Sequence, residues 1–371
     1  MTTPTDFDIF LTTFPGLEPT LLAELRGKGF KAAKAVPGGV VIRGGWPEVW
    51  RANLWVRGAG RVLARLDHFH ATHLAQLDLR ARHVPWATVL RPDVPFRVEA
   101  TCAASKLYHS GAVAERIATA IRETLGAPES PEAVVTVMAR LEHDRCTISL
   151  DTSGEALHKR GYKAAINPAP LRETMASLFL AQCGYLGEEP LLDPMCGAGT
   201  FVIEAAEIAA RLNPGRARGF AFEHFAGFDA DSWARMRAVA SRRAPAARCY
   251  GSDRDAGAVA MARANAERAG VAEATEFRQC TISDAAPPEG PPGLVMVNPP
   301  YGTRLGEKAE LAPLYRALGQ VLLRRFAGWR VGLVTAEPLL ARATALPFLP
   351  TAAPVPHGGL RVTLYRTGAL P

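Results

Sequence analysis

Asparagine, two prolines and a tyrosine stand in a row at residues 298–301. The apolar stretch before them predicts a buried parallel strand, and the prolines stop it because each fixes φ and lacks an N–H donor. Open α/β sheets bind ligands beyond the carboxyl ends of their strands. There the Asn298 oxygen and the Pro299 carbonyl can accept both hydrogens of an amino group, while the Tyr301 ring stacks on a planar substrate. The alternative is a strand-ending turn with a buried tyrosine.

A glycine-containing turn follows another strand-ending acid. A short strand is predicted to end at Asp193, and a helix is predicted over 202–212. Between them, Gly197 and Gly199 allow the backbone to approach a ligand closely. This unit is not the dinucleotide fingerprint, because Val202 takes the third glycine position, and no Gly-Lys-Ser/Thr sequence follows. Both observations count against NAD and ATP.

Two further acids lie at or after predicted strands. The strand 250–253 ends at Asp253, and Asp284 comes shortly after the strand 275–280. A carboxylate at the first of these positions can accept from both hydroxyls of a ribose. Taken singly, each acid could equally be a helix cap or a surface carboxylate.

Alternating strands and helices must position these residues. Helices are predicted over 171–183, 255–269 and 311–325, and further strands over 329–335 and 360–365. This alternation predicts an α/β fold with a doubly wound parallel sheet.

The separation of Asp193 from Asp253 is far longer than the spacing of about 20 residues that is usual between a glycine turn and the second acid. The excess, residues 213–243, is an insertion rich in Phe, Arg and Trp. It could be a substrate-side flap or a helical brace, and the sequence does not decide between them.

The first 150 residues contain a different pattern. Strands are predicted over 7–13 and 38–43 and helices over 17–25 and 46–54, which fits a small α+β unit similar to a ferredoxin-like segment. A second unit follows, with its predicted elements at residues 61–69, 96–101, 110–125 and 134–150. Ser105, Lys106, His109 and Ser110 precede or begin its helix and could bind a phosphate or simply cap the helix.

Residues 158–163, here called the basic segment, combine four cations or histidines with one tyrosine (HKRGYK). They follow a stretch, 151–161, that we expect to act as a linker between domains. A basic groove with an aromatic inside it would suit an RNA track. A solvated run of charge is the competing interpretation.

Composition excludes several classes of protein. The net charge of +7 is compatible with nucleic acid. No run of about 18 apolar residues predicts a membrane helix, and the N-terminus lacks a basic region, so we expect a cytoplasmic protein without a signal peptide.

The six cysteines form no C-x-x-C pair. His68, His70 and His73 have no second ligand group at a zinc spacing, and we expect no metal.

The longer motifs resemble the THUMP-containing guanine-N2 RNA methyltransferases, most closely bacterial enzymes of the RlmL/YpsC 23S rRNA type. The motifs are RGYK…APLRETMA, PLLDPMCGAGTFVIEAA, GFAFEHFAGFD, GSDRD and VNPPYGTRLG. The similarity is strong from about residue 160 onward and loose before it, where RVLARL, FRVEAT and CTISLD carry a likeness to a THUMP domain.

This resemblance implies three domains. They are a ferredoxin-like segment (1–55), a THUMP RNA-binding domain (56–155) and a Rossmann-like class I methyltransferase domain with a seven-stranded sheet (160–371). The implied cofactor is S-adenosyl-L-methionine. The residues expected to act on the substrate are Asn298, Pro299 and Tyr301. Those expected at the cofactor are Asp193, Cys196, Gly197, Gly199, Thr200, Asp253, Asp284 and Asn298.

The resemblance further implies an RNA partner, with 23S rRNA favoured over tRNA, no membrane, and a monomer. Three alternatives stay open. Related tRNA guanine-N2 enzymes share the architecture, an adenine-N6 methyltransferase could use the same Asn-Pro-Pro-Tyr sequence, and an inactive RNA-binding or ribosome-assembly factor could keep the fold.

Overall fold

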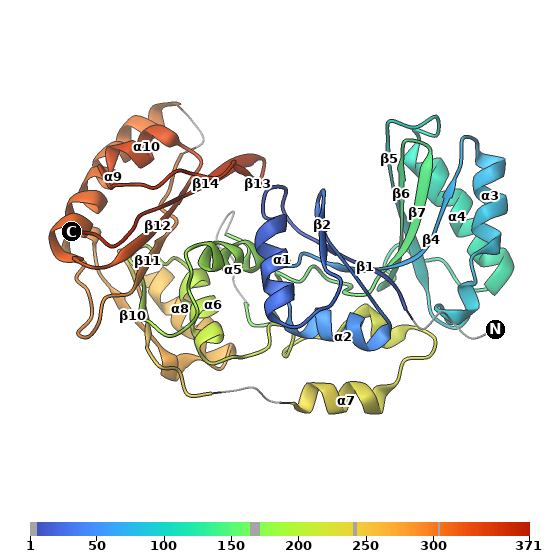
Figure 1. Ribbon diagram of the computed structural model, residues 1–371, viewed down its shortest axis with the longest axis horizontal. Coiled ribbons are helices and arrows are strands. Elements are labelled where there is room, and N and C mark those ends of the chain that lie inside the picture. Colours follow the sequence, from blue (N-terminus) through green and yellow to red (C-terminus); the bar gives the residue numbers. More distant parts are fainter. Residues whose placement is uncertain (1–5, 164–170, 240–242, 303–304) are drawn as a thin grey trace. The chain divides into compact units, whose positions relative to one another are not determined.

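The computed structural model describes residues 6–163, 171–239, 243–302 and 305–371, with the backbone alone given for 305–310 (Figure 1). Its packing defines two compact units. Unit 1 consists of Met1–Thr13, Leu22–Leu157 and Arg218–Val239. Unit 2 consists of Phe14–Leu21, His158–Ala217 and Ala240–Pro371. No helix in the described residues is long and apolar enough to cross a bilayer.

Unit 1 contains one seven-stranded sheet in the order β2-β3-β1-β4-β7-β6-β5. All neighbouring strands in it are antiparallel except β5 and β6, which are parallel. The strands and helices predicted for residues 7–150 are present, and β2 and α3 are additional. The elements are β1 (Phe7–Thr12), α1 (Glu18–Gly27), β2 (Lys34–Val36), β3 (Gly39–Gly44), α2 (Trp46–Trp55), β4 (Val62–His70), α3 (Leu74–His83), β5 (Phe96–Ala103), α4 (Ser110–Leu125), β6 (Val135–Glu142) and β7 (Arg145–Asp151).

Unit 2 contains a second seven-stranded sheet, in the order β10-β9-β8-β11-β12-β14-β13. The strands from β10 to β12 are parallel, whereas β14 is antiparallel to both β12 and β13. This order confirms the predicted Rossmann-like α/β fold. The elements are α5 (Glu173–Gln182), β8 (Leu191–Asp193), α6 (Thr200–Ala209), β9 (Cys249–Asp253), α8 (Ala256–Arg268), β10 (Thr275–Gln279), β11 (Leu294–Val297), α9 (Leu305–Arg325), β12 (Arg330–Thr335), α10 (Pro338–Ala343), β13 (Val355–His357) and β14 (Leu360–Arg366).

The core of unit 2 explains why β11 reads as an unbroken apolar run. All four of its residues are buried, as expected for a parallel strand with neighbours on both sides. On one side of the sheet they meet α9, whose Tyr315, Leu318 and Leu322 are fully buried in the same cluster as Val297. This packing fixes the strand that leads into Asn298.

The insertion packs as part of unit 1. Its described residues include a short turn of helix and α7 (Ala230–Ala238). Phe222 lies 6.1 Å from the Trp50 ring, Phe225 lies 5.7 Å from the Trp46 ring, and Trp233 stands edge-on to Phe222 at 5.0 Å. Burying aromatic side chains of this size is among the largest contributions to a core.

The expected linker begins as packed structure. Thr152 and Ser153 are fully buried, and their hydroxyl groups lie 2.9 and 2.7 Å from the side-chain Nδ2 and Oδ1 atoms of Asn53, respectively. The chain therefore leaves β7 through a hydrogen-bonded segment of unit 1 rather than through a solvated spacer.

Candidate functional site

Four parallel strands bring the predicted polar residues to one edge of the sheet of unit 2. Asp193, the last residue of β8, pairs with Gly251 of β9, and Asp253, the last residue of β9, pairs with Gln279 of β10. On the other side, Leu192 pairs with Val295 of β11, so Asn298 follows beyond the same edge. We call Asp193, Asp253, Asp284 and Asn298, with the glycine turn, the strand-end site.

The glycine turn is held by the second acid. The Gly197 amide donates to Asp253 Oδ2 and the Asp255 amide donates to Oδ1, each at 3.0 Å. Gly199 has φ +85°, and a Cβ atom there would lie 3.2 Å from both Ala262 Cβ and Ile203 Cδ1. A glycine is required at this position for both reasons. Asp253 retains lone pairs for a hydroxyl ligand, since a carboxylate offers about four.

Two further side chains brace the turn, and the sequence analysis did not assign them to it. Asn265 of α8 donates through Nδ2 to the Ala198 carbonyl at 3.1 Å. Lys163 donates through Nζ to Thr200 Oγ1 at 2.9 Å and pairs with Glu173 at 2.5 Å. Neither Asn265 nor Lys163 is close to the glycine turn in the sequence, so only the tertiary structure shows that they support it.

Asp193 is a carboxyl group in an apolar environment. Its residue is 3% exposed, and its Oδ1 accepts from the Met195 amide at 3.1 Å. Burial, with a smaller contribution from the nearby Asp253 charge, raises the pKa of Asp193 to about 8. A buried acid with such a pKa is suited to a cationic ligand, which would draw it back to the charged form.

Asp284 lies on the surface beside the end of β9. The Cys280 amide donates to the Asp253 carbonyl at 2.9 Å, which ties the chain after β10 to β9. Thr281 Oγ1 donates to Asp284 Oδ2 at 2.7 Å. The carboxyl group is exposed and able to accept from an amino group.

Asn298 carries the clearest sign of a ligand-binding role. Its Oδ1 is buried, and no donor among the described residues reaches it. Such an orphan acceptor costs about 1–3 kcal/mol and calls for an explanation. Pro299 is buried, and Tyr301 is half-buried beside it. This arrangement is compatible with a planar substrate whose amino group donates to Asn298 Oδ1 and whose ring stacks on Tyr301.

Two cations of the basic segment pair with carboxylates inside the fold, which neither of the two interpretations above foresaw, whereas Lys159 is exposed. Arg160 is 4% exposed and forms a buried ion pair with Glu204 at 3.0 Å. Tyr162 is 2% exposed, and Lys163 is paired as described. Burial and neighbouring cations lower the pKa of His158 to about 4. A one-dimensional charge pattern cannot show that the matching carboxylates lie far along the chain.

Two other clusters have structural roles. His109 Nδ1 accepts from the Ala112 amide at 3.1 Å and so caps the start of α4. In the loop before the helix, Asp144 accepts from the Lys106 amide at 2.7 Å. His73 likewise caps α3 by accepting from the Gln76 amide at 3.3 Å. Within the described residues, no group of three His, Cys, Asp or Glu side chains could hold a metal.

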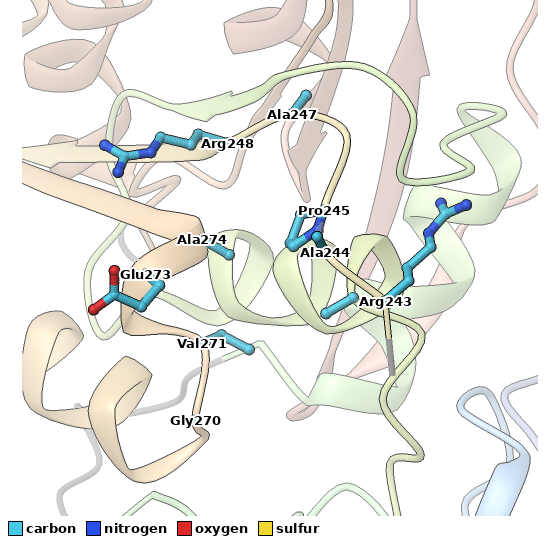
Figure 2. Close-up of a pocket in the computed structure, with 10 residues that line it drawn as sticks. Arg243, Ala244, Pro245, Ala247, Arg248, Gly270, Val271, Glu273 and Ala274 are labelled. Carbon is cyan, nitrogen blue, oxygen red and sulfur yellow. The ribbon is translucent and has the colours of Figure 1, made fainter. Parts of the chain in front are cut away.

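A pocket of about 450 Å³ lies at the opposite, amino-terminal edge of β9 and β10 (Figure 2). Two arginines line it, and Figure 2 shows their guanidinium groups pointing away from each other. Arg243 donates to the Ala209 carbonyl at 2.9 Å, and Arg248 lies 3.8 Å from Glu276. Without convergent polar groups, this pocket is a weaker ligand site than the strand-end site.

Comparison with known proteins agrees with this geometry. A family model described as "RMKL-like, methyltransferase domain" matches residues 160–348, just over half of the chain. Models described as "RlmL ferredoxin-like domain" and "THUMP domain" match residues 8–63 and 71–151.

Individual relatives are similar over most of the chain. Ribosomal RNA large subunit methyltransferase K/L of Methylococcus capsulatus is 35% identical over 357 residues, which are 91% of this chain and 48% of the relative. The chain thus spans about half the length of that relative.

Two crystal structures share the fold of the whole chain. One is a predicted N6-adenine-specific DNA methylase from Listeria monocytogenes, 29% identical with a TM-score of 0.88, covering 98% of this chain and 96% of that one. The other, SMU.472 complexed with SAH, is 26% identical with a TM-score of 0.87, covering 100% of both chains. From the family match and the site geometry together, the chain belongs to the RMKL-like methyltransferase family, with RlmL-type ferredoxin-like and THUMP domains before the methyltransferase domain.

Proposed function

We propose that the protein is an S-adenosyl-L-methionine-dependent RNA methyltransferase that methylates the exocyclic N2 of a guanosine, in 23S rRNA. The orphaned, buried Asn298 Oδ1 at the carboxyl ends of the strands carries this proposal. It is the acceptor that an incoming amine requires. The rRNA assignment draws on the name of the Methylococcus relative, and the cofactor draws on the family and on the SAH complex of SMU.472.

The residues of the strand-end site fit the cofactor part by part. Asp193 would pair with the ammonium of the methionine moiety, Asp253 with the ribose hydroxyls, and Asp284 with the adenine amino group. The backbone of the glycine turn, held from Cys196 to Thr200, would lie against the cofactor. When bound, the cofactor supplies an electrophilic methyl group on a sulfonium.

The substrate residues act mainly by alignment. The target guanine must leave its stack, which costs a few kcal/mol, and stacking on Tyr301 would return about 1–3 kcal/mol. Asn298 Oδ1 and the Pro299 carbonyl would accept from the N2 hydrogens and turn the nitrogen lone pair toward the methyl group. The N–CH₃ bond forms as the S–CH₃ bond breaks, the sulfonium becomes a thioether, and N2 releases a proton to water or to the Asn298 oxygen.

The remaining assignments complete the proposal. Residues 1–55 and 56–155 would form the ferredoxin-like and THUMP domains that hold the RNA, and 160–371 the catalytic domain, in a monomer that acts in the cytoplasm. A second candidate is adenine-N6 methylation, which the name of the Listeria structure favours and which presents a similar amine to Asn298. A tRNA substrate uses the same geometry, whereas an inactive assembly factor would not bind the cofactor.

The test is to incubate the full chain with separated rRNA and tRNA and methyl-labelled S-adenosyl-L-methionine, then identify the modified nucleoside. We expect N2-methylguanosine in large-subunit rRNA. Asn298→Ala should lower turnover at least 100-fold with cofactor affinity nearly unchanged, because it removes the acceptor that aligns the amine.

Asn213→Ala is the matched control, since Asn213 lies in the same unit away from the strand-end site and should leave turnover unchanged. Labelled N6-methyladenosine would establish the second candidate instead. Full activity in Asn298→Ala would refute the role of this residue, and failure to bind the cofactor would favour an inactive factor.

A further inference from the structure

A buried tyrosine hydroxyl holds the loop that follows Asn298. Tyr315, in α9, is fully buried in the core of unit 2. Its Oη lies 3.2 Å from the Pro300 carbonyl oxygen and 3.2 Å from Thr335 Oγ1 at the end of β12. The Glu337 amide donates to the same Thr335 Oγ1 at 3.2 Å.

The chemistry of these groups gives the hydrogen bonds a direction. A carbonyl can only accept, so Tyr315 must give its single proton to Pro300. With that proton used, the Thr335 hydroxyl must donate to Tyr315 Oη. Thr335 Oγ1 in turn accepts from the Glu337 amide. The result is a relay from backbone amide to threonine to tyrosine to the Pro300 carbonyl. Burial raises the pKa of the Tyr315 hydroxyl, which keeps its proton in place.

The loop after Asn298 has few backbone donors that could hold its conformation. Two successive prolines supply no N–H donor, so neither Pro299 nor Pro300 can anchor the chain by donating to a neighbour. Pro300 is exposed, and its carbonyl could otherwise turn toward water. The relay instead ties it to a side chain packed beside Val297 and Leu333 of β11 and β12.

We infer that Tyr315 is a positioning residue for methyl transfer: through the Pro300 carbonyl it fixes the peptide between Asn298 and Tyr301 in the orientation that receives the target amine. This inference rests on the proposed function. It adds a residue that touches neither base nor cofactor and that lies outside the Asn-Pro-Pro-Tyr sequence.

The direct test is Tyr315→Phe, which removes the hydroxyl and keeps the ring. We expect kcat to fall about tenfold, the rate equivalent of one hydrogen bond, with the KM for S-adenosyl-L-methionine within twofold of wild type. Tyr185→Phe is the matched control. Its hydroxyl is equally buried and lies 3.4 Å from Cys249 Sγ at the start of β9, remote from the loop. Its turnover should equal that of wild type.

The donor to Tyr315 offers a second pair of variants. Thr335→Ser keeps the hydroxyl and removes only the methyl group, whereas Thr335→Val keeps the methyl group and replaces the hydroxyl with a second one. We therefore expect a higher kcat in Thr335→Ser than in Thr335→Val. Equal kcat values in Tyr315→Phe and Tyr185→Phe, or equal losses in Thr335→Ser and Thr335→Val, would overturn the inference.

A crystal structure of Tyr315→Phe makes the inference testable apart from the substrate. A displaced Pro300 carbonyl is expected, and an unmoved carbonyl would refute the positioning role. If the wild-type protein labels no RNA, the proposed function fails, but this structural comparison still decides whether Tyr315 orients the loop.

Discussion

The strand-end site and the basic segment are both polar regions of unit 2, yet their polar groups are satisfied differently. In the basic segment, Arg160 and Lys163 each meet a buried carboxylate. At the strand-end site, the Asn298 oxygen lacks a donor among the described residues, and Asp193 has a pKa raised to about 8. Arg160 and Lys163 are neutralised within the fold, whereas the strand-end site keeps an acceptor and an acid that a ligand could use.

Comparing the two regions shows when a buried polar atom without a hydrogen-bond partner indicates a ligand site. The Tyr162 hydroxyl in the basic segment also lacks a described partner, but its residue is 2% exposed and lies near the paired groups Glu204 and Arg160. Asn298 stands next to an exposed Pro300 and a half-buried Tyr301, where a ligand can approach. An orphan group therefore points to a ligand only where the surrounding residues leave a path to it.

Arg160→Met tests the structural half of this comparison and has the largest expected effect. Removing one partner leaves the Glu204 charge buried, so we expect the free energy of unfolding to fall by about 3–5 kcal/mol, measured by denaturant titration. Arg248→Met is the control, because its pair with Glu276 is half-exposed and is worth at most about 1 kcal/mol. Reduced RNA affinity with unchanged stability in Arg160→Met would favour the RNA-track interpretation.

Asp193→Asn tests the functional half. We expect S-adenosyl-L-methionine to bind 10- to 100-fold more weakly in calorimetry, since a charged hydrogen bond contributes about 1.5–3 kcal/mol. Asp255→Asn keeps the exposed cap of α8 and should change affinity less than twofold. Unchanged affinity in Asp193→Asn would separate this carboxyl group from the cofactor.

The same substitution should stabilise the cofactor-free protein. The pKa of Asp193 is raised in the folded state, so its contribution to stability is complete below the unfolded value of about 3.9 and is lost as pH rises toward 8. The gain in melting temperature of Asp193→Asn over wild type should therefore grow between pH 4 and pH 8. A gain independent of pH would contradict the raised pKa.

Proton release on cofactor binding is the smallest expected effect. At pH 7 the Asp193 carboxyl is mostly protonated and would lose its proton when it pairs with an ammonium. Affinity should rise by up to tenfold per pH unit and level off above about pH 8. Calorimetry in two buffers of different ionisation enthalpy measures the released protons directly, and none should be released by Asp193→Asn.

Local pattern predicted most of the fold. The predicted helix 110–125 coincides with α4, and the apolar run before Asn298 is β11, because both depend on periodicity and burial that neighbouring residues reveal. The short strand β13 and the helix α3 were not predicted. A strand of three residues owes its existence to pairing with β14, which is a tertiary property.

The candidate site was predicted in part for the same reason. Strand-ending acids and the glycine turn are local signals, and parallel pairing brings them to one edge. Lys163, Asn265 and Tyr315 were missed as supports, because their partners are 37, 67 and 15 residues away along the chain. The ion pairs of Arg160 and Lys163 were missed for the same reason.

Residues 218–239 return to unit 1 late in the chain, so part of the core of unit 1 stays incomplete during translation. Trp46 and Trp50 are translated early, but Phe222 and Phe225 leave the ribosome more than 170 residues later. Until then, the nascent N-terminal region exposes two indole rings that the finished protein covers. A truncation ending at residue 157 would keep them uncovered permanently, so we expect that fragment to aggregate. Any separation of unit 1 from unit 2 must keep residues 218–239 with unit 1.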